Sequence, residues 1–250
     1  MARHGVLMET VLHAGTLCAV CVYFRNDIIS LFGSLFNWIG EIVGRGGHHS
    51  LDKNAESAQK YRDDKRMILG IIIATVPTGL MGVLAKNWFE SLFGRIDMIG
   101  IAFLITAVLL FAGETLSARI NGIASSPGPV EAFFIGVFQG VAITPGISRS
   151  GATISSGLAL GLKPEAAVRF SFLLSVPAIM GATVLSLKEG WVMERGQLAG
   201  YIVGPLVAAV IGYFSIGAVT RIARRGKLRW FALYCALFGV AVIIASLSGW

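Results

Sequence analysis

The stretch Pro145-Gly146-Ile147-Ser148-Arg149-Ser150-Gly151-Ala152-Thr153 is polar, cationic and framed by glycines, although most of the surrounding chain is apolar. An apolar run precedes it at 130–142 and another follows it at 154–162. Each run is too short to span a bilayer as a helix, because that takes roughly 20 residues. Irregular backbone inside a membrane is tolerated only where protein buries it or where it lines a wet cavity. We therefore predict a re-entrant hairpin over residues 130–162.

The composition of the whole chain agrees with a membrane setting. Of 250 residues, 55% are hydrophobic and 14% are charged, and the mean hydropathy is +0.73. A soluble domain carries about 25% charged residues. We therefore predict one all-α polytopic membrane domain over residues 1–250. The net charge of +7 is explained by cytoplasmic loops rich in Lys and Arg, so the expected partner is the lipid bilayer and no nucleic acid.

Long apolar runs predict six transmembrane helices. They cover residues 6–24, 67–85, 97–116, 164–187, 198–220 and 228–247. The polar and basic stretch 25–66 is expected as a cytoplasmic loop whose amphipathic front, 28–43, suits a membrane surface. A second basic cluster at 221–229 falls on the same side, which is predicted to be cytoplasmic. The hairpin then enters from the cytoplasmic side, and both termini face outward.

The order of the spans predicts an internal repeat. Spans one to three and four to six share a hydropathy pattern, and the odd number of spans per unit gives the units opposite topology. The repeats are expected at 1–129 and 130–250. The second unit opens with the hairpin, whereas the first has no counterpart before Val6, so the first repeat is expected to be truncated.

The central motif has the donors that a phosphate site needs. The half-helix that begins near Ser150 or Gly151 offers free N–H groups and a positive dipole end to an anion. Arg149 adds a permanent guanidinium that suits phosphate oxygens. A phosphate at that depth suggests a lipid phosphate. The structural alternative, without a ligand, is a turn in which Arg149 is paired with the carboxylate of Glu9 or Glu114.

The segment Gln139-Gly-Val-Ala-Ile-Thr-Pro-Gly-Ile-Ser-Arg-Ser-Gly-Ala-Thr153 closely resembles the second signature of the bacterial undecaprenyl-diphosphate phosphatases of the bacitracin-resistance type. The downstream segment Ala-Val-Arg-Phe-Ser-Phe-Leu-Leu-Ser-Val-Pro at 167–177 is similarly typical of that family. Residues 8–15, Met-Glu-Thr-Val-Leu-His-Ala-Gly, are similar more loosely, and His13 stands where the family commonly has glutamine. The resemblance covers essentially the whole chain.

The resemblance implies a hydrolase of the bacterial inner membrane with its active site open to the periplasm. It removes the terminal phosphate of undecaprenyl diphosphate, which recycles the lipid carrier for peptidoglycan synthesis and gives bacitracin resistance. The implied catalytic residues are Arg149, Ser148, Ser150 and Thr153. The expected substrate-binding residues are Gly146, Gly151 and Gln139.

The family's first signature is a glutamate-rich segment ending in Ser-Ser-x-Gly-His, which has no counterpart in this sequence. The divalent metal that the resemblance implies, Mg²⁺ or Ca²⁺, therefore has no recognisable ligands in the chain. Two alternatives stay open beside the phosphatase: a non-catalytic binder or transporter of polyprenyl phosphates, and an inactive form shortened at its N-terminus. The sequence also leaves a homodimer open.

Overall fold

The computed structural model describes residues 2–44, 55–92, 94–120, 122–188 and 198–248. Over these residues the chain forms ten α-helices and one isolated bridge between Ala124 and Leu162, which confirms the predicted all-α class. The helices are α1 (Ala2–Tyr23), α2 (Arg25–Ile42), α3 (Ala55–Leu84), α4 (Lys86–Leu92), α5 (Ile96–Ile120), α6 (Pro129–Val141), α7 (Arg149–Ala159), α8 (Pro164–Lys188), α9 (Leu198–Arg224) and α10 (Arg229–Leu247).

Five helices of the described chain, α3, α5, α8, α9 and α10, are long and apolar enough to cross a membrane. The first predicted span differs from them. Residues 11–23 of α1 meet α2 at an angle of 80°, so the two count as a sixth crossing only if they form one broken span. Helix α8 begins at the expected residue because Pro164 suits the first turn of a helix, where no N–H is needed.

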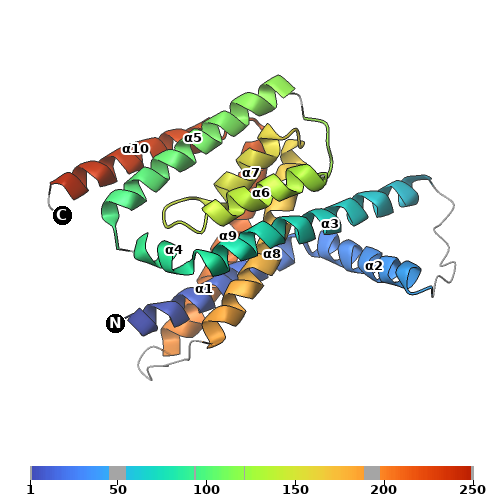
Figure 1. Cartoon of the computed structure of the whole chain (residues 1–250), viewed down its shortest axis with the longest axis horizontal. Coiled ribbons are helices and arrows are strands. Elements are labelled where there is room, and N and C mark those ends of the chain that lie inside the picture. The colour runs from blue at the N-terminus through green and yellow to red at the C-terminus, as the bar shows by residue number, and fades with distance from the viewer. Residues whose placement is uncertain (1, 45–54, 93, 121, 189–197, 249–250) are drawn as a thin grey trace.

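The helices form three groups around α7 (Figure 1). Helices α5 and α10 lie side by side, α1 packs against α8 and α9, and α3 packs against α6. Helix α7 contacts α5, α6 and α8, and residues 151–158 are all buried. Small side chains allow this burial: a Cβ on Gly113 of α5 would lie only 2.7 Å from the Cα atom of Ser155.

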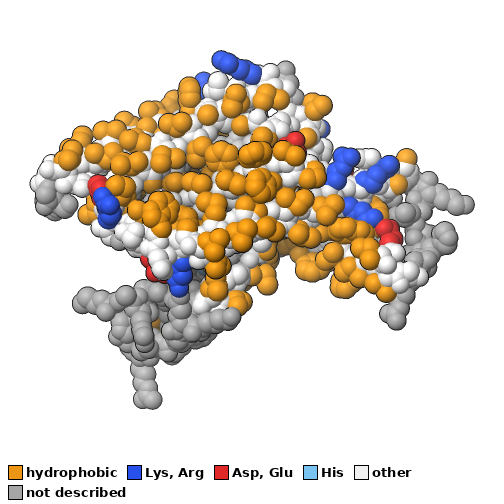
Figure 2. Space-filling model, in the orientation of Figure 1, with side chains coloured by type: hydrophobic (Ala, Val, Ile, Leu, Met, Phe, Trp, Pro, Cys, Tyr) orange, Lys and Arg blue, Asp and Glu red, His pale blue; other side chains and the backbone are white. Residues whose placement is uncertain are grey.

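Hydrophobic side chains cover most of the molecule's central face, and Lys and Arg gather toward its edges (Figure 2). Large apolar residues on α9, including Ile211 and Phe214, are 60% and 70% exposed. A soluble protein rarely exposes an apolar surface of this extent, whereas a membrane protein faces lipid with it. The surface therefore supports a multi-pass membrane protein.

The stretch 25–66, expected as a polar loop, contains helix at both of its ends. Its front is α2, and residues 55–66 form the first three turns of α3, whereas residues 45–54 lie outside the described chain. Local hydropathy marks such amphipathic and polar turns as non-spanning, but it does not decide whether they are helical.

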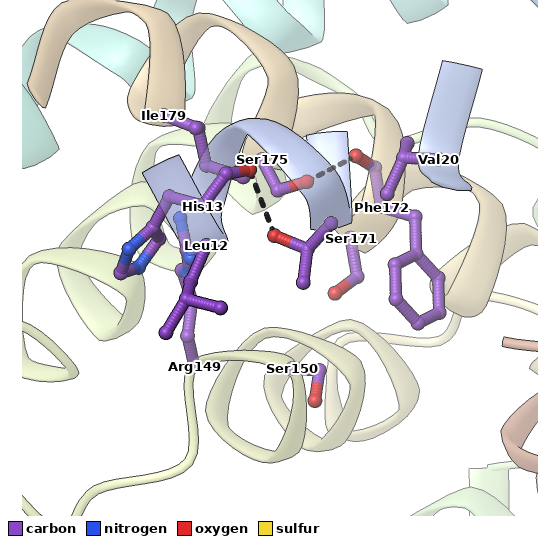
Figure 3. A pocket seen from close by; sticks show the side chains of 10 residues that line it. Leu12, His13, Val20, Arg149, Ser150, Ser171, Phe172, Ser175 and Ile179 are labelled. Atoms are coloured by element: carbon purple, nitrogen blue, oxygen red, sulfur yellow. Dashed lines mark hydrogen bonds between the residues drawn. The ribbon is translucent and has the colours of Figure 1, made fainter. Parts of the chain in front are cut away.

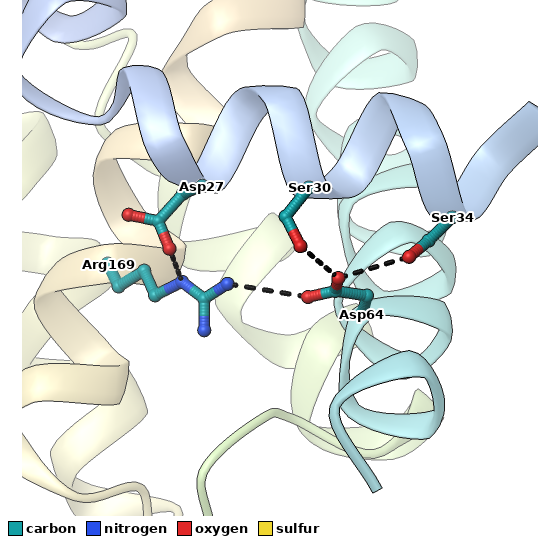
Figure 4. A network of polar contacts seen from close by, with 5 residues as sticks. All are labelled: Asp27, Ser30, Ser34, Asp64 and Arg169. Atoms are coloured by element: carbon teal, nitrogen blue, oxygen red, sulfur yellow. Dashed lines mark hydrogen bonds and ion pairs between the residues drawn. The ribbon is translucent and has the colours of Figure 1, made fainter. Parts of the chain in front are cut away.

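A polar network holds α2 against α3 and α8 (Figure 4). The Asp64 carboxylate is only 4% exposed and accepts hydrogen bonds from Ser30 at 2.6 Å and Ser34 at 3.0 Å. Arg169 of α8 lies between two carboxylates, with its Nε 2.7 Å from Asp27 and an Nη 3.6 Å from Asp64. A buried carboxylate needs such partners because desolvation without them is costly.

Candidate functional site

The central motif is a turn between two short helices that pack against each other. Helix α6 ends at Val141 and α7 begins at Arg149. Gly146 has φ +93°, in the left-handed region that favours glycine, and a Cβ there would lie 2.9 Å from both the Ile99 carbonyl oxygen and the Ala102 methyl group. The turn therefore requires glycine both for its dihedral angle and for its close approach to α5.

Ser148 caps the first turn of α7. Its Oγ accepts a hydrogen bond from the N–H of Gly151 at 3.1 Å, and its own N–H donates to Oγ1 of Thr106 on α5 at 3.1 Å. A serine at this position satisfies one of the N–H groups that a helix start leaves without a partner. The cap does not use the backbone N–H groups of Arg149 and Ser150, which remain as donors at the start of α7.

A cavity of about 340 Å³ lies at this helix start, between α1, α7 and α8 (Figure 3). Its polar lining comes from all three helices: Arg149 and Ser150 of α7, His13 and Thr16 of α1, and Ser171 and Ser175 of α8. Its apolar lining is Leu12, Val20, Phe172 and Ile179. The cavity thus combines one cation and several hydroxyls with an apolar wall.

Arg149 is half-buried, and its side chain has no ion pair or hydrogen bond with any described residue. One of the two carboxylates that the structural alternative offered as its partner is engaged elsewhere: Glu114 lies 2.7 Å from Nε of Arg229. The side chain of Glu9 lies outside the described residues. Arg149 therefore brings an uncompensated positive charge to the cavity from the described part of the chain.

Thr153 lies outside the cavity lining and forms hydrogen bonds with residues that line it. It is 1% exposed, and its Oγ1 donates to the Arg149 carbonyl oxygen at 2.9 Å. Its single proton is then used, so the 2.5 Å contact with Oγ of Ser171 has the Ser171 hydroxyl as donor. Thr153 thereby connects the first turn of α7 to a serine that lines the cavity from α8.

Three other predicted site residues lie outside the cavity lining. Gln139 is 1% exposed and its Nε2 donates to Oγ1 of Thr78 at 3.3 Å, because its face of α6 packs on α3. Its Oε1 is buried without a partner. Gly151 is buried behind the Ser148 cap, and Gly146 shapes the turn. Only Arg149 and Ser150 of the predicted residues line the cavity directly.

Four polar lining residues were not predicted, although the sequence carries a weak signal for them. His13 and Thr16 are three residues apart in α1, and Ser171 and Ser175 are four apart in α8. Residues at these spacings share one face of a helix. A polar pair on one face of an apolar helix indicates a surface that turns away from lipid.

The described residues include no group of three or more His, Cys, Asp or Glu side chains that could hold a metal ion. The divalent metal expected from the resemblance therefore finds no ligand set among them. His48 and His49, an adjacent histidine pair in a glycine-rich stretch that could bind a metal, lie outside the described residues.

The fold and the cavity together define a class of protein. It is a multi-pass helical membrane protein with a cationic, hydroxyl-lined cavity at the start of a buried helix. Such a helix start, with a guanidinium that no carboxylate of the described residues pairs, is suited to an anion, and phosphate fits the forked donor geometry of arginine.

The comparisons with known proteins give the family. The family described as bacitracin resistance protein BacA matches residues 1–241, so the chain belongs to it. An undecaprenyl-diphosphatase of Carboxydothermus hydrogenoformans is 36% identical over 254 aligned residues, which cover 100% of this chain and 86% of the relative. One from Syntrophotalea carbinolica is 39% identical, over 95% of this chain and 83% of the relative.

A relative with the same name from Methanothermobacter thermautotrophicus is 42% identical over 179 residues, 71% of this chain and 99% of that protein. The resemblance noted in the central motif is therefore confirmed along the chain. The family match begins at residue 1, and the expected truncation of the first repeat is not borne out by these comparisons.

Proposed function

We propose that this protein is an undecaprenyl-diphosphatase, which hydrolyses undecaprenyl diphosphate to undecaprenyl phosphate and inorganic phosphate. The reaction recycles the lipid carrier for peptidoglycan synthesis and confers resistance to bacitracin. Relatives with this name cover most of the chain. The observation that carries the proposal is Arg149, a cation without a carboxylate partner among the described residues, at a cavity between membrane helices.

Arg149 binds the terminal phosphate and offsets the charge on its oxygens as the bond to the bridging oxygen breaks. Little covalent chemistry is required of the protein in phosphoryl transfer, so positioning and charge neutralisation provide most of the rate. The backbone N–H groups of Arg149 and Ser150, which the Ser148 cap does not use, direct the positive ends of their dipoles to the same phosphate. The undecaprenyl phosphate leaves with the bridging oxygen, and water supplies the oxygen of the released phosphate.

The hydroxyls divide into two roles. Ser150 and Ser171 line the cavity and orient phosphate oxygens, whereas Ser148 and Thr153 hold the first turn of α7 in place. The apolar wall formed by Leu12, Val20 and Ile179 accommodates the first isoprene units of the substrate. Gly146 and Gly151 allow the tight turn, and Gln139 fixes α6 against α3.

In this proposal α6 and α7 form a re-entrant hairpin. Their 13 and 11 residues correspond to about 20 and 16 Å of helix, well short of a hydrocarbon core of about 30 Å. We further propose that the halves 1–129 and 130–250 are inverted repeats and that the cavity opens toward the periplasm, with the side rich in Lys and Arg taken as cytoplasmic. Single-cysteine labelling at Ser148 and Arg225 from each side of a sealed vesicle tests this topology.

The divalent metal and the homodimer are further proposals from the family resemblance. The described residues include no group of three or more His, Cys, Asp or Glu side chains that could hold Mg²⁺ or Ca²⁺, and the proposed steps use only the chain's own residues. Phosphate release measured after chelation and after addition of each ion tests the dependence on metal. Light scattering of the detergent-solubilised protein tests the dimer.

The decisive experiment compares phosphate release from undecaprenyl diphosphate by the wild type and by Arg149→Ala. Loss of one such stabilising contact lowers kcat by about 10²–10³-fold. Arg62→Ala is the matched control, because Arg62 is an exposed arginine on α3 away from the cavity. Its activity is expected to equal that of the wild type.

Full activity of Arg149→Ala would overturn the assignment of the site. A folded wild type that binds undecaprenyl diphosphate through Arg149 but never releases phosphate would instead support a non-catalytic binder. Binding is measured by competition with a fluorescent polyprenyl diphosphate, so that the two outcomes are distinguished.

A further inference from the structure

A second depression, away from the proposed active site, lies between α5 and α10. It is a groove of about 500 Å³ whose floor consists of alanines, including Ala107 and Ala112 of α5 and Ala236 of α10. Its walls are large apolar side chains that are strongly exposed: Phe111 is 61% and Trp230 64% exposed. Because both helices qualify as membrane spans, this groove faces the lipid.

The groove continues into a polar pocket of about 360 Å³ at the C-terminal end of α5. The two depressions share Phe111 and Arg229, and the polar pocket adds Glu114 and Arg119. An apolar channel thus leads directly to a site with two guanidinium groups. This combination matches a molecule with a hydrocarbon chain and an anionic head.

The charges in the polar pocket leave a net positive site. Glu114 binds Arg229 twice, accepting from its backbone N–H at 2.8 Å and from Nε at 2.7 Å. This fixes the position of the Arg229 guanidinium while leaving its two terminal nitrogens without a described partner. Arg119 is exposed and has no ion pair with any described residue.

The surroundings favour a membrane lipid over a soluble anion. The exposed Arg221, Arg225 and Lys227 lie next to this end of α10, and no ion pair engages them among the described residues. Such a cluster beside a membrane span attracts anionic headgroups. Trp230, at the start of α10, has the amphipathic ring that is enriched at the headgroup level.

We infer that the α5–α10 groove binds an anionic glycerophospholipid, with one acyl chain along the alanine floor and its phosphate at Arg119 and Arg229. The site is separate from the cavity at Arg149, because the two share no lining residue. It is also independent of the proposed hydrolysis. The lipid stabilises the contact between α5 and α10, and α5 in turn packs against α7.

The test measures lipid retention by the detergent-purified protein, using native mass spectrometry with phosphatidylglycerol and phosphatidylcholine of identical acyl chains. The wild type is expected to retain phosphatidylglycerol preferentially. Arg119→Gln is expected to bind phosphatidylglycerol about fivefold more weakly, since one cation near a headgroup contributes about that factor. Its binding of phosphatidylcholine and its phosphatase activity are expected to stay unchanged.

Arg62→Gln is the matched control, because Arg62 is equally an exposed arginine but lies on α3 outside the groove. Ala236→Leu fills the floor and is expected to weaken the retention of both lipids. Equal retention of the two lipids by the wild type, or unaltered phosphatidylglycerol binding by Arg119→Gln, would overturn the inference. So would a dimer that Ala236→Leu converts to a monomer, since a second chain would then occupy the groove.

Discussion

Two arginines on neighbouring helices differ in what surrounds them. Arg169 of α8 lies between Asp27 and Asp64 and connects three helices, whereas Arg149 of α7 has no carboxylate partner among the described residues and faces a cavity. Both are partly buried in an apolar protein. A buried cation with anionic partners contributes to the packing of the fold. One without them retains its charge for a ligand.

The two sites are physically coupled through α8. Arg169 lies two residues before Ser171, which lines the cavity and donates to Thr153. The paired arginine therefore holds the helix that carries one wall of the site. If Arg169 is a structural arginine and Arg149 a binding arginine, substitution of Arg169 lowers mainly the free energy of unfolding. Substitution of Arg149 then lowers mainly the rate of phosphate release.

The largest effect on stability is expected from Arg169→Ala. It leaves the nearly buried Asp64 with two serine donors and no cation, which costs about 3 kcal/mol in the free energy of unfolding. Unfolding of the detergent-solubilised protein, followed by circular dichroism, measures this loss. Arg149→Ala is expected to leave the unfolding free energy nearly unchanged.

Arg224→Ala is the matched control for Arg169→Ala. Arg224 pairs with Glu165 at 3.3 Å, but both side chains are at least half exposed, so the expected cost is below about 1 kcal/mol. The double variant Arg169→Ala/Asp64→Asn is expected to regain part of the loss. Equal costs for Arg169→Ala and Arg224→Ala would show that the network has no structural role.

A smaller effect on stability, with a clear effect on activity, is expected from Gly146→Ala. The left-handed dihedral costs about 1–2 kcal/mol for alanine, and the new methyl group meets α5. The turn must then shift, which displaces Arg149, and a displacement of about 1 Å lowers kcat by roughly 10²-fold. Melting temperature and phosphate release measure the two effects.

Gly79→Ala serves as the control for Gly146→Ala, because a methyl group there meets nothing within 4 Å in α3. It is expected to stabilise the helix by up to about 1 kcal/mol. Normal phosphate release by Gly146→Ala would mean that the turn does not position Arg149.

The smallest effect is expected from Thr153→Val, which keeps the shape of the side chain but removes the acceptor for Ser171. The free energy of unfolding is expected to fall by about 1 kcal/mol. If Ser171 orients the phosphate, KM rises a few-fold while kcat changes little. Thr220→Val is the control, because Thr220 donates only to its own helix, at the Ile216 carbonyl oxygen. Indistinguishable kinetics of the two variants would exclude the proposed link through Ser171.

The sequence alone determined the five long apolar helices and the chemical character of the central motif. Apolar runs located α3, α5, α8, α9 and α10, because the length and hydropathy needed to cross a membrane are local properties. Glycines, hydroxyls and Arg149 in one short stretch indicated an anion site, because a turn and a helix start are also formed by neighbouring residues.

Only the tertiary structure decided which distant side chains meet. The pairing of Glu114 with Arg229 rather than Arg149 depends on how α5 packs against α10. His13 and Ser171 face Arg149 because α1 and α8 pack around α7, and no local pattern specifies that arrangement. Helix α2, which follows the 80° bend, contacts Asp64 and Arg169, and both of these residues lie far along the chain. Local hydropathy determines whether a helix lies in the membrane, whereas the packing between helices determines which polar side chains form pairs.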